Sequence, residues 1–348
     1  MPPLPAADLE HILQHASCLE ELRGARLFIT GGTGFFGCWL LESLVYANEK
    51  LNLGATATVL TRDAGAFGRK MPHLANQPAL SFWQGDACSF PFPPGDFSHI
   101  IHAATEASAQ LNSDNPLQML NTAALGTRRA LEFATHCGAR RFLLTSSGAV
   151  YGTQPSDITH VAEEYAGAPD TTDIGSAYAQ GKRFAEFDCT LWHKQFGLET
   201  TIARCFALVG PHLPLDAHFA IGNFLRDGMI GGPIRVGGDG TPYRSYLYAA
   251  DLAIWLWTIL LRGEAGRAYN VGSQEDGTIA SLAQTVAGCF APQPAVEIAR
   301  RPVAGQKASR YVPCTQRAQS ELGLRQYITT EEALRKTISW HEQQRGAA

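Results

Sequence analysis

Up to residue 204, short apolar runs alternate with longer segments in which apolar residues recur every three or four positions. Short apolar runs are typical of buried strands, and the longer period is typical of helices. Strands are predicted at 26–30, 56–61, 80–84, 99–103, 141–145 and 198–204, and helices at 8–22, 38–46 and 116–137. Strands that alternate with helices need crossover connections, so we predict an α/β fold with a doubly wound parallel (Rossmann) sheet.

The pattern changes after residue 204. Proline and glycine become frequent between 210 and 242, and the alternation of strands and helices weakens. We therefore predict a helical extension over 1–23 and a dinucleotide-binding domain over 24–204 that carries the catalytic residues. A smaller mixed substrate-binding lobe over 205–348, ending in a helix at 330–344, is expected to return some segments to the first domain.

Composition narrows the class of protein. Hydrophobic residues make up 45% and charged residues 17%, which is ample for a buried core. The net charge is −4 and the basic residues are scattered, so nucleic acid is not an expected partner. The eight cysteines contain no Cys-x-x-Cys pair, so we expect thiols in a reducing cytoplasm and no metal site. No signal peptide is recognised, and the apolar stretch 252–261 is too short to span a membrane, so we expect a cytoplasmic protein.

A glycine cluster follows the first predicted strand and precedes a helix. Its glycines are spaced three apart, which permits a tight turn, backbone approach to a pyrophosphate and close packing of helix on sheet. An ordinary turn is the alternative, but this strand–turn–helix context favours dinucleotide binding. The candidate residues are Gly31, Thr33, Gly34, Phe35, Phe36 and Gly37.

The end of the second strand bears on the choice of cofactor. An arginine, Arg62, follows Thr61 there, and a guanidinium would pair with a 2′-phosphate, so NADP is favoured. The alternative is that Arg62 is solvated and Asp63 binds the ribose of NAD. After the third strand, Asp86 beside Ala87 is expected at the adenine, unless Asp86 only forms a turn.

Tyr178 and Lys182 are four residues apart, which places them on one face of a helix. An ammonium near a phenol stabilises the phenolate, so this tyrosine could exchange a proton with a sugar hydroxyl while hydride moves at the same carbon. Hydroxyls at 145–147 follow a strand and should emerge at the carboxyl edge of the sheet, where such sheets bind ligands. The alternatives are a surface Tyr–Lys pair and serines that cap turns.

Together these motifs resemble the extended short-chain dehydrogenase/reductase superfamily of NAD(P)-dependent nucleotide-sugar epimerases, dehydratases and reductases. The resemblance covers about 24–324 and includes His102-Ala103-Ala104, Asn121, Gly126-Thr127, Gly210-Pro211, 238–246, Asp251, 269–272 and Arg301-Pro302. It implies a catalytic trio of Ser147, Tyr178 and Lys182. It also places Ala103, Ala104 and Thr145 at the cofactor, and Ser146, Asn223, Arg244 and Arg301 at a nucleotide-diphosphate sugar, with Arg244 on the pyrophosphate. A homodimer through the helices at 116–137 and 178–196 is implied as well.

Departures from the family pattern narrow the expected reaction. Gly148 and Ala149 replace the acidic pair of the 4,6-dehydratases, and Ala149 also replaces a glutamate that the decarboxylases tend to keep. Both reactions are therefore less expected. Ala207 stands where relatives often carry an asparagine on the diphosphate, and His212 and His218 are expected as ordinary lobe residues. Glu106 either enters the pocket or is solvated in a loop.

Two reactions need only the trio and a nicotinamide. They are reduction of a 4-keto sugar and 4-epimerisation through a transient ketone. Arg62 favours the first, an NADPH-dependent 4-ketoreductase, with an NAD-dependent 4-epimerase as the alternative. A dehydratase or decarboxylase remains open, and so does a non-enzymatic NAD(P)-sensing regulator. Such regulators characteristically lose the tyrosine or the lysine, and both are present here.

Overall fold

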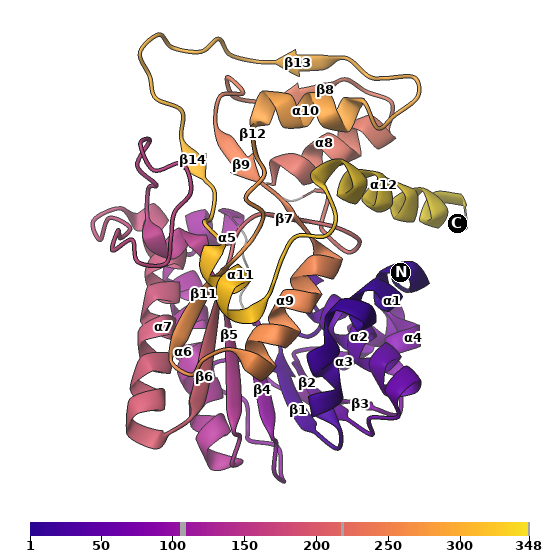
Figure 1. Cartoon of the computed structure of the whole chain (residues 1–348), viewed down its shortest axis with the longest axis vertical. Helices are drawn as coiled ribbons and strands as arrows, with labels where there is room; N and C mark the ends of the chain where they lie inside the picture. Colours follow the sequence, from indigo (N-terminus) through magenta and orange to yellow (C-terminus); the bar gives the residue numbers. More distant parts are fainter. Residues whose placement is uncertain (105–108, 217–218, 347–348) are drawn as a thin grey trace. The chain divides into compact units, whose positions relative to one another are not determined.

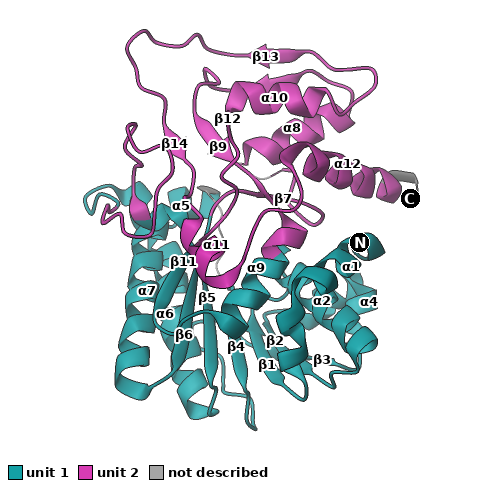
Figure 2. Cartoon of the chain, in the orientation of Figure 1, with its two compact units in different colours: residues 1–150, 169–205, 253–269 teal, residues 151–168, 206–252, 270–348 magenta. Residues whose placement is uncertain are grey.

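The computed structural model describes residues 1–104, 109–216 and 219–346, so the candidates Glu106 and His218 lie outside the described residues. The chain forms two compact units that interleave along the sequence (Figure 2). Unit 1 holds residues 1–150, 169–205 and 253–269, and unit 2 holds 151–168, 206–252 and the segment from 270 onward. Each unit is therefore built from separate stretches of the chain, and sequence position alone does not say to which unit a residue belongs.

Unit 1 is built on a seven-stranded sheet with the order β11-β6-β5-β4-β1-β2-β3 (Figure 1). The first six strands of the chain pair in parallel. The order reverses at β1, which lies between β2 and β4, and ligands bind at the carboxyl ends of the strands beside such a reversal. The bounds are β1 Arg26–Thr30, β2 Thr56–Thr61, β3 Leu80–Gln84, β4 His99–His102, β5 Arg141–Ser147, β6 Glu199–Cys205 and β11 Arg267–Val271.

Helices cover this sheet. Phe133 of α6 and Cys189 of α7 are buried in one apolar cluster with the strand residues Phe28 and Phe142, so both helices pack on the same face. Helices α2 and α9 also pack together, where buried Trp257 donates from Nε1 to Ser43 Oγ at 2.9 Å. The bounds are α1 Ala6–His15, η1 Ser17–Leu22, α2 Phe35–Leu51, α3 Ala64–Lys70, α4 Pro72–Ala75, α5 Ala109–Asp114, α6 Pro116–His136, η2 Gly148–Tyr151, η3 Ile174–Ser176, α7 Ala177–Phe196 and α9 Ala249–Arg262.

Unit 2 combines small sheets with helices. The sheets have the orders β10-β7, β12-β9-β14 and β13-β8. A buried asparagine joins its first segment to the rest: Asn270 Oδ1 accepts from the Tyr151 hydroxyl at 2.8 Å, and Asn270 Nδ2 donates to Val161 O at 2.9 Å. The bounds are β7 Leu208–Val209, α8 Ala220–Met229, β8 Ile234–Val236, β9 Tyr243–Ser245, β10 Leu247–Tyr248, β12 Asp276–Thr278, α10 Ile279–Ala287, β13 Val296–Ile298, β14 Arg310–Tyr311, α11 Gln316–Leu322 and α12 Thr330–Gly346.

The predicted fold class, a doubly wound sheet with a smaller mixed lobe, is confirmed. Several predicted elements have different ends in the structure, among them the helix predicted at 38–46, which runs from Phe35 to Leu51, and two of the differences have a clear physical reason. Strand β5 does not end at Thr145 but continues to Ser147, because it stays paired with β6 as far as Cys205. The helix predicted at 8–22 ends at His15, because the backbone of Ala16 leaves the helical region with a ψ of 59°, and a 3₁₀ turn follows.

Candidate active site

The glycine turn at the end of β1 has a geometry that only glycine adopts easily. Gly31 has a φ of +71°, and a Cβ added there would lie 2.3 Å from the backbone oxygen of Ala103. A Cβ on Gly37 would lie 2.3 Å from the Cα of Gly32. The turn therefore lies so close to the end of β4, and its own residues so close to one another, that only glycine leaves enough room at both positions.

The N-terminus of α2 can hold a dinucleotide phosphate. Gly34 is its exposed N-cap residue, and no side chain caps the helix there. The helix continues for 17 residues from Phe35, through Phe36, so its dipole places partial positive charge at this end. A Cβ on Gly34 would meet only Gly31 O, at 3.4 Å, which leaves the outer side of the turn open. The half-exposed Thr33 beside it completes a cradle that fits a pyrophosphate.

The ends of β2 and β3 carry the predicted ribose and adenine contacts. Asp63 Oδ1 accepts a hydrogen bond from Ala66 N at 2.8 Å and caps α3, while the side chain of Arg62 is exposed. One oxygen of the Asp63 carboxylate is thus engaged within the protein. Asp86 is exposed, and its Oδ1 accepts from Cys88 N at 2.9 Å, in a turn that also presents Ala87.

The last residues of β1 and β4 form a polar pair that fixes the backbone beside the glycine turn. Thr30 Oγ1 lies 2.8 Å from Nδ1 of buried His102 and accepts from Ala104 N at 3.2 Å. Burial lowers the pKa of His102 to about 3, so this ring is neutral at physiological pH. The pair therefore ties the backbone of Ala103 and Ala104 to the end of β1, beside the glycine turn.

The predicted catalytic residues lie at the end of β5 and at the start of α7. Ser147 is the last residue of β5, is 7% exposed, and its Oγ accepts from Ala149 N at 3.2 Å. Tyr178 is the second residue of α7 and is half-buried. The Nζ of buried Lys182 donates to the backbone oxygen of Thr145 at 2.7 Å and lies 6.0 Å from the centre of the Tyr178 ring.

The charge on Lys182 is poised to act on the phenol. Desolvation by burial is the largest effect and lowers the pKa of Lys182 to about 8. The side chain is therefore mostly protonated at pH 7, and its ammonium can stabilise a phenolate on Tyr178. This arrangement can move a proton between a tyrosine and a hydroxyl group bound beside it.

Two unpredicted polar residues also contact this part of unit 1. Asn112 Oδ1 accepts from Tyr178 N at 3.0 Å, a backbone contact that no sequence motif signals. Glu186 accepts a hydrogen bond from Ser146 Oγ at 2.5 Å, so this predicted substrate hydroxyl is engaged within the protein. Glu186 could have been found from its spacing, because it follows Lys182 by four residues, as Lys182 follows Tyr178.

The predicted substrate residues Asn223, Arg244 and Arg301 lie in unit 2. Asn223 of α8 lines a pocket of about 280 Å³ together with Val236, the last residue of β8, and Gly237, which follows it. Arg244 of β9 donates from Nη1 to Tyr243 O at 2.7 Å, and burial lowers the pKa of its guanidinium. Arg301 is exposed between β13 and β14.

No group of three or more His, Cys, Asp or Glu side chains within 1–104, 109–216 and 219–346 could hold a metal ion. Among the helices of these same ranges, none combines the length and apolarity that crossing a bilayer requires.

The sequence and fold were compared with known proteins. Residues 27–272 match the NAD dependent epimerase/dehydratase family. UDP-glucuronic acid decarboxylase 1 from Arabidopsis thaliana is 30% identical over 317 residues, which cover 90% of this chain and 69% of the relative. An epimerase structure from Methanothermobacter thermautotrophicus has a TM-score of 0.79 at 22% identity, covering 96% of this chain and 97% of that one. The dTDP-glucose 4,6-dehydratase of Bacillus anthracis, solved with NAD, has a TM-score of 0.74 at 19% identity, with coverages of 92% and 97%.

Fold, glycine turn and sequence similarity together define an enzyme of the extended short-chain dehydrogenase/reductase type. The chain belongs to the NAD-dependent epimerase/dehydratase family.

Proposed function

We propose that the chain oxidises C4 of a nucleotide-diphosphate sugar and reduces C4 again in the same catalytic cycle. The observation that carries this proposal is the position of Lys182, buried under Tyr178 and bonded to Thr145 O at 2.7 Å. A fixed ammonium beside a phenol is what a reversible proton transfer at a secondary alcohol requires. Bound NAD⁺, held by the glycine turn and the N-terminus of α2, would supply the acceptor and donor of the hydride at that carbon.

Each residue of the trio has a separate task in this proposal. The Tyr178 phenolate removes the proton of the C4 hydroxyl while hydride leaves C4, and later gives that proton back. Lys182 stabilises the phenolate. Ser147, at the end of β5, hydrogen-bonds the reacting oxygen and orients it toward the phenol. Arg244 binds the diphosphate through its guanidinium. Asn223, which lines the pocket beside α8, binds the nucleotide.

The bond that breaks at C5 after oxidation of C4 decides the class of reaction. We favour a uronic acid as the substrate, so that the bond from C5 to the carboxylate breaks. Oxidation at C4 turns a sugar with a C6 carboxylate into a β-keto acid. The bond from C5 to the carboxylate then breaks, carbon dioxide leaves, and the electron pair forms an enolate whose oxygen Tyr178 and Ser147 can stabilise. Water then supplies the proton that takes the place of the carboxylate on C5, and the C4 ketone forms again. Loss of carbon dioxide itself needs no acidic side chain, whereas elimination of water does, so Gly148 and Ala149 weigh less against decarboxylation than against dehydration, although Ala149 replaces the glutamate that decarboxylases tend to keep. The relatives named UDP-glucuronic acid decarboxylase support this choice.

The test is direct. The purified protein, loaded with NAD⁺, is mixed with UDP-glucuronic acid, and the absorbance of reduced nicotinamide and the masses of the products are followed. We expect transient reduction of the nicotinamide and a UDP-pentose that has lost carbon dioxide. UDP-glucose and dTDP-glucose are tested beside it, with epimerisation and loss of water as the alternative outcomes. No reduction and no product with any of the three would contradict the proposal.

A second candidate rests on Arg62. Its exposed guanidinium at the end of β2 suits a 2′-phosphate, and this keeps the NADPH-dependent 4-ketoreductase as an alternative. The mass of the cofactor that the purified protein releases distinguishes the two. NADP, with consumption of NADPH on a 4-keto sugar, favours the reductase. Retained NAD favours the redox-neutral cycle, including a 4-epimerase.

The homodimer also stays a proposal. Apolar side chains are exposed on α6 and α7: Leu117 (66%), Leu125 (47%), Phe184 (38%), Phe187 (59%) and Phe196 (56%). Such a concentration on two neighbouring helices is typical of a face that a second copy covers. Because α6 and α7 lie together on one side of the sheet, two copies could pair them as four helices.

A further inference from the structure

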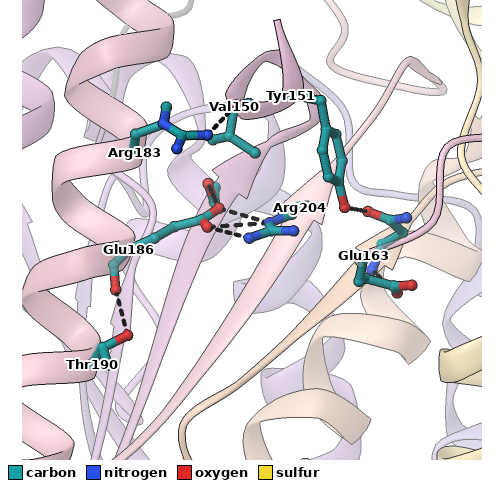
Figure 3. Close-up of polar contacts among 9 residues, drawn as sticks. Val150, Tyr151, Glu163, Arg183, Glu186, Thr190 and Arg204 are labelled. Atoms are coloured by element: carbon teal, nitrogen blue, oxygen red, sulfur yellow. Dashed lines mark hydrogen bonds and ion pairs between the residues drawn. The ribbon is translucent and has the colours of Figure 1, made fainter. Parts of the chain in front are cut away.

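A buried carboxylate joins three elements of unit 1. Glu186 of α7 accepts from Ser146 Oγ of β5 at 2.5 Å (Oε1) and from Arg204 Nη2 of β6 at 2.7 Å (Oε2). Arg204 Nε also lies 3.1 Å from each carboxylate oxygen (Figure 3). The side chains of Arg204 and Glu186 are 17% and 11% exposed. The carboxylate is thus held in place by two partners from neighbouring strands.

This arrangement is not explained by stability alone. Burying two charges has a desolvation cost that offsets much of their attraction, so a buried ion pair is weak evidence for a stabilising role. An apolar residue would fit a site covered by α7 at least as well, since Ala185 and Cys189 of the same helix face the apolar core. The bidentate geometry instead defines one position for the carboxylate, and hence for the Ser146 hydroxyl that it binds.

That hydroxyl belongs to the strand end that carries the proposed site. Side chains alternate along β5, and Phe142 and Leu144 face the core beneath α7, so Ser146 faces α7 as well. Its neighbours on each side are Thr145, whose oxygen binds Lys182, and Ser147. Two successive turns of α7 are thus tied to successive residues of β5, Lys182 to Thr145 and Glu186 to Ser146.

Glu186 also acts on the charge of Lys182. Its carboxylate raises the pKa of that lysine, against the larger lowering by burial. The other groups that act on Lys182 are the thiols of Cys205 on β6 and Cys189 on α7, both with pKa values raised by burial. Lys182 in turn helps burial to lower the pKa of His102 on β4, whose ring is neutral. Glu186 is therefore the only carboxylate among the groups that act on Lys182 within the described residues.

We propose that Glu186, held by Arg204, is a positioning residue that sets α7 against the end of β5 and so aligns Ser147 with Tyr178 and Lys182. This rests on the proposed function of that trio. It extends the site by a carboxylate that contacts neither substrate nor cofactor. A displacement of about 1 Å at a catalytic group can reduce a rate about a hundredfold. Loss of the hydrogen bond between Glu186 and Ser146 should therefore lower kcat and leave substrate and cofactor binding largely unchanged.

The test compares Glu186→Gln and Glu186→Asp in the full chain, loaded with NAD⁺ and assayed with UDP-glucuronic acid. Glu49→Gln, an exposed carboxylate on α2, is the matched control. We expect Glu186→Gln to lower kcat at least about tenfold with KM changed less than about threefold. Its activity should also fall at a lower pH than in the wild type, because Lys182 loses its proton more easily without the carboxylate. Glu186→Asp should recover part of kcat, and wild-type kcat in Glu186→Gln would overturn the proposal.

Two further arms separate this inference from the proposed function. Active Tyr178→Phe would mean that the proposed trio is wrong, whereas inactive Tyr178→Phe with fully active Glu186→Gln would overturn only the role of Glu186. Hydrogen exchange of residues 141–152, followed by mass spectrometry, needs no substrate. We expect faster exchange there in both Glu186→Gln and Ser146→Ala, with no additional effect in the double variant. Unchanged exchange in Glu186→Gln would overturn the proposal even if no substrate were known.

Discussion

The ammonium nitrogen of Lys182 donates a hydrogen bond to the backbone oxygen of Thr145, at 2.7 Å. The lysine comes from α7 and the oxygen from β5, so this bond fixes a charge at the carboxyl edge of the sheet. Burial brings the pKa of that lysine to about 8. A charge that is held in place and close to neutralisation makes the proposed chemistry sensitive both to substitution and to pH.

Replacing the phenol tests the proton transfer. Tyr178→Phe should abolish turnover, because the ring remains but no oxygen exchanges a proton with the substrate. The amount of nicotinamide cofactor that copurifies should stay close to the wild-type amount. Tyr46→Phe, a phenol on α2 that donates to Glu10 at 2.7 Å, is the matched control and should keep its activity. Unchanged turnover in Tyr178→Phe would remove the phenol from the mechanism.

Replacing the lysine tests the electrostatic part. In the proposed mechanism, protonated Lys182 stabilises the phenolate of Tyr178, and this stabilisation is lost as the pH rises through about 8, where Lys182 loses its proton. In Lys182→Met the phenol pKa should move up toward its ordinary range. The rate of nicotinamide reduction should fall about a hundredfold at neutral pH and recover only at higher pH. Lys194→Met, exposed on the same helix, should keep the wild-type pH profile, and an identical profile in Lys182→Met would contradict the assigned role.

The glycine turn offers a matched pair of substitutions. Gly31 and Gly54 both have positive φ values, +71° and +63°, but only a Cβ at Gly31 would meet other atoms, 2.3 Å from Ala103 O. Gly54→Ala should cost about 1 kcal/mol of unfolding free energy from backbone strain alone. Gly31→Ala should cost about 1–3 kcal/mol more from the clash, and it should lose bound cofactor. Chemical denaturation and cofactor release measure both, and equal losses would argue against the tight cradle.

Arg62 tests the choice of cofactor. If its guanidinium pairs with a 2′-phosphate, Arg62→Ala should weaken NADP binding about tenfold and change NAD binding less than about twofold. Arg69→Ala, an exposed arginine on α3, is the control. Titration of each cofactor against protein fluorescence gives the dissociation constants. Equal effects on both cofactors would indicate that Arg62 does not distinguish them.

The exposed apolar face tests the dimer. Phe187 is 59% exposed on α7, and Phe187→Asp should convert a particle of twice the chain mass into one of the chain mass. Ile230→Asp replaces an apolar side chain in unit 2 that is slightly more exposed, at 66%, and should leave the mass unchanged. Light scattering after size-exclusion chromatography measures the mass. A wild type that is already monomeric would reject the proposed dimer.

Local patterns in the sequence were sufficient for much of the fold and for part of the candidate site. The apolar runs gave the bounds of β1, β2 and β3 correctly, because a buried parallel strand needs a continuous apolar segment whatever lies beside it. Glycines spaced three apart identified the turn, because the steric limits there act within a few residues. The Tyr178–Lys182 spacing placed both side chains on one helical face for the same local reason.

Contacts between distant segments were decided only by the tertiary structure. Strand β5 reaches Ser147 because β6 pairs with it, and no local pattern encodes that pairing. Segment 151–168 joins unit 2 through the contacts of Tyr151 and Val161 with Asn270, more than a hundred residues away. Glu186 is paired only when α7, β5 and β6 are packed together. The backbone conformation of a turn depends on steric limits among a few neighbouring residues, so the local sequence determines it. The burial of a side chain and the pairing of its charge depend on which distant segments pack together.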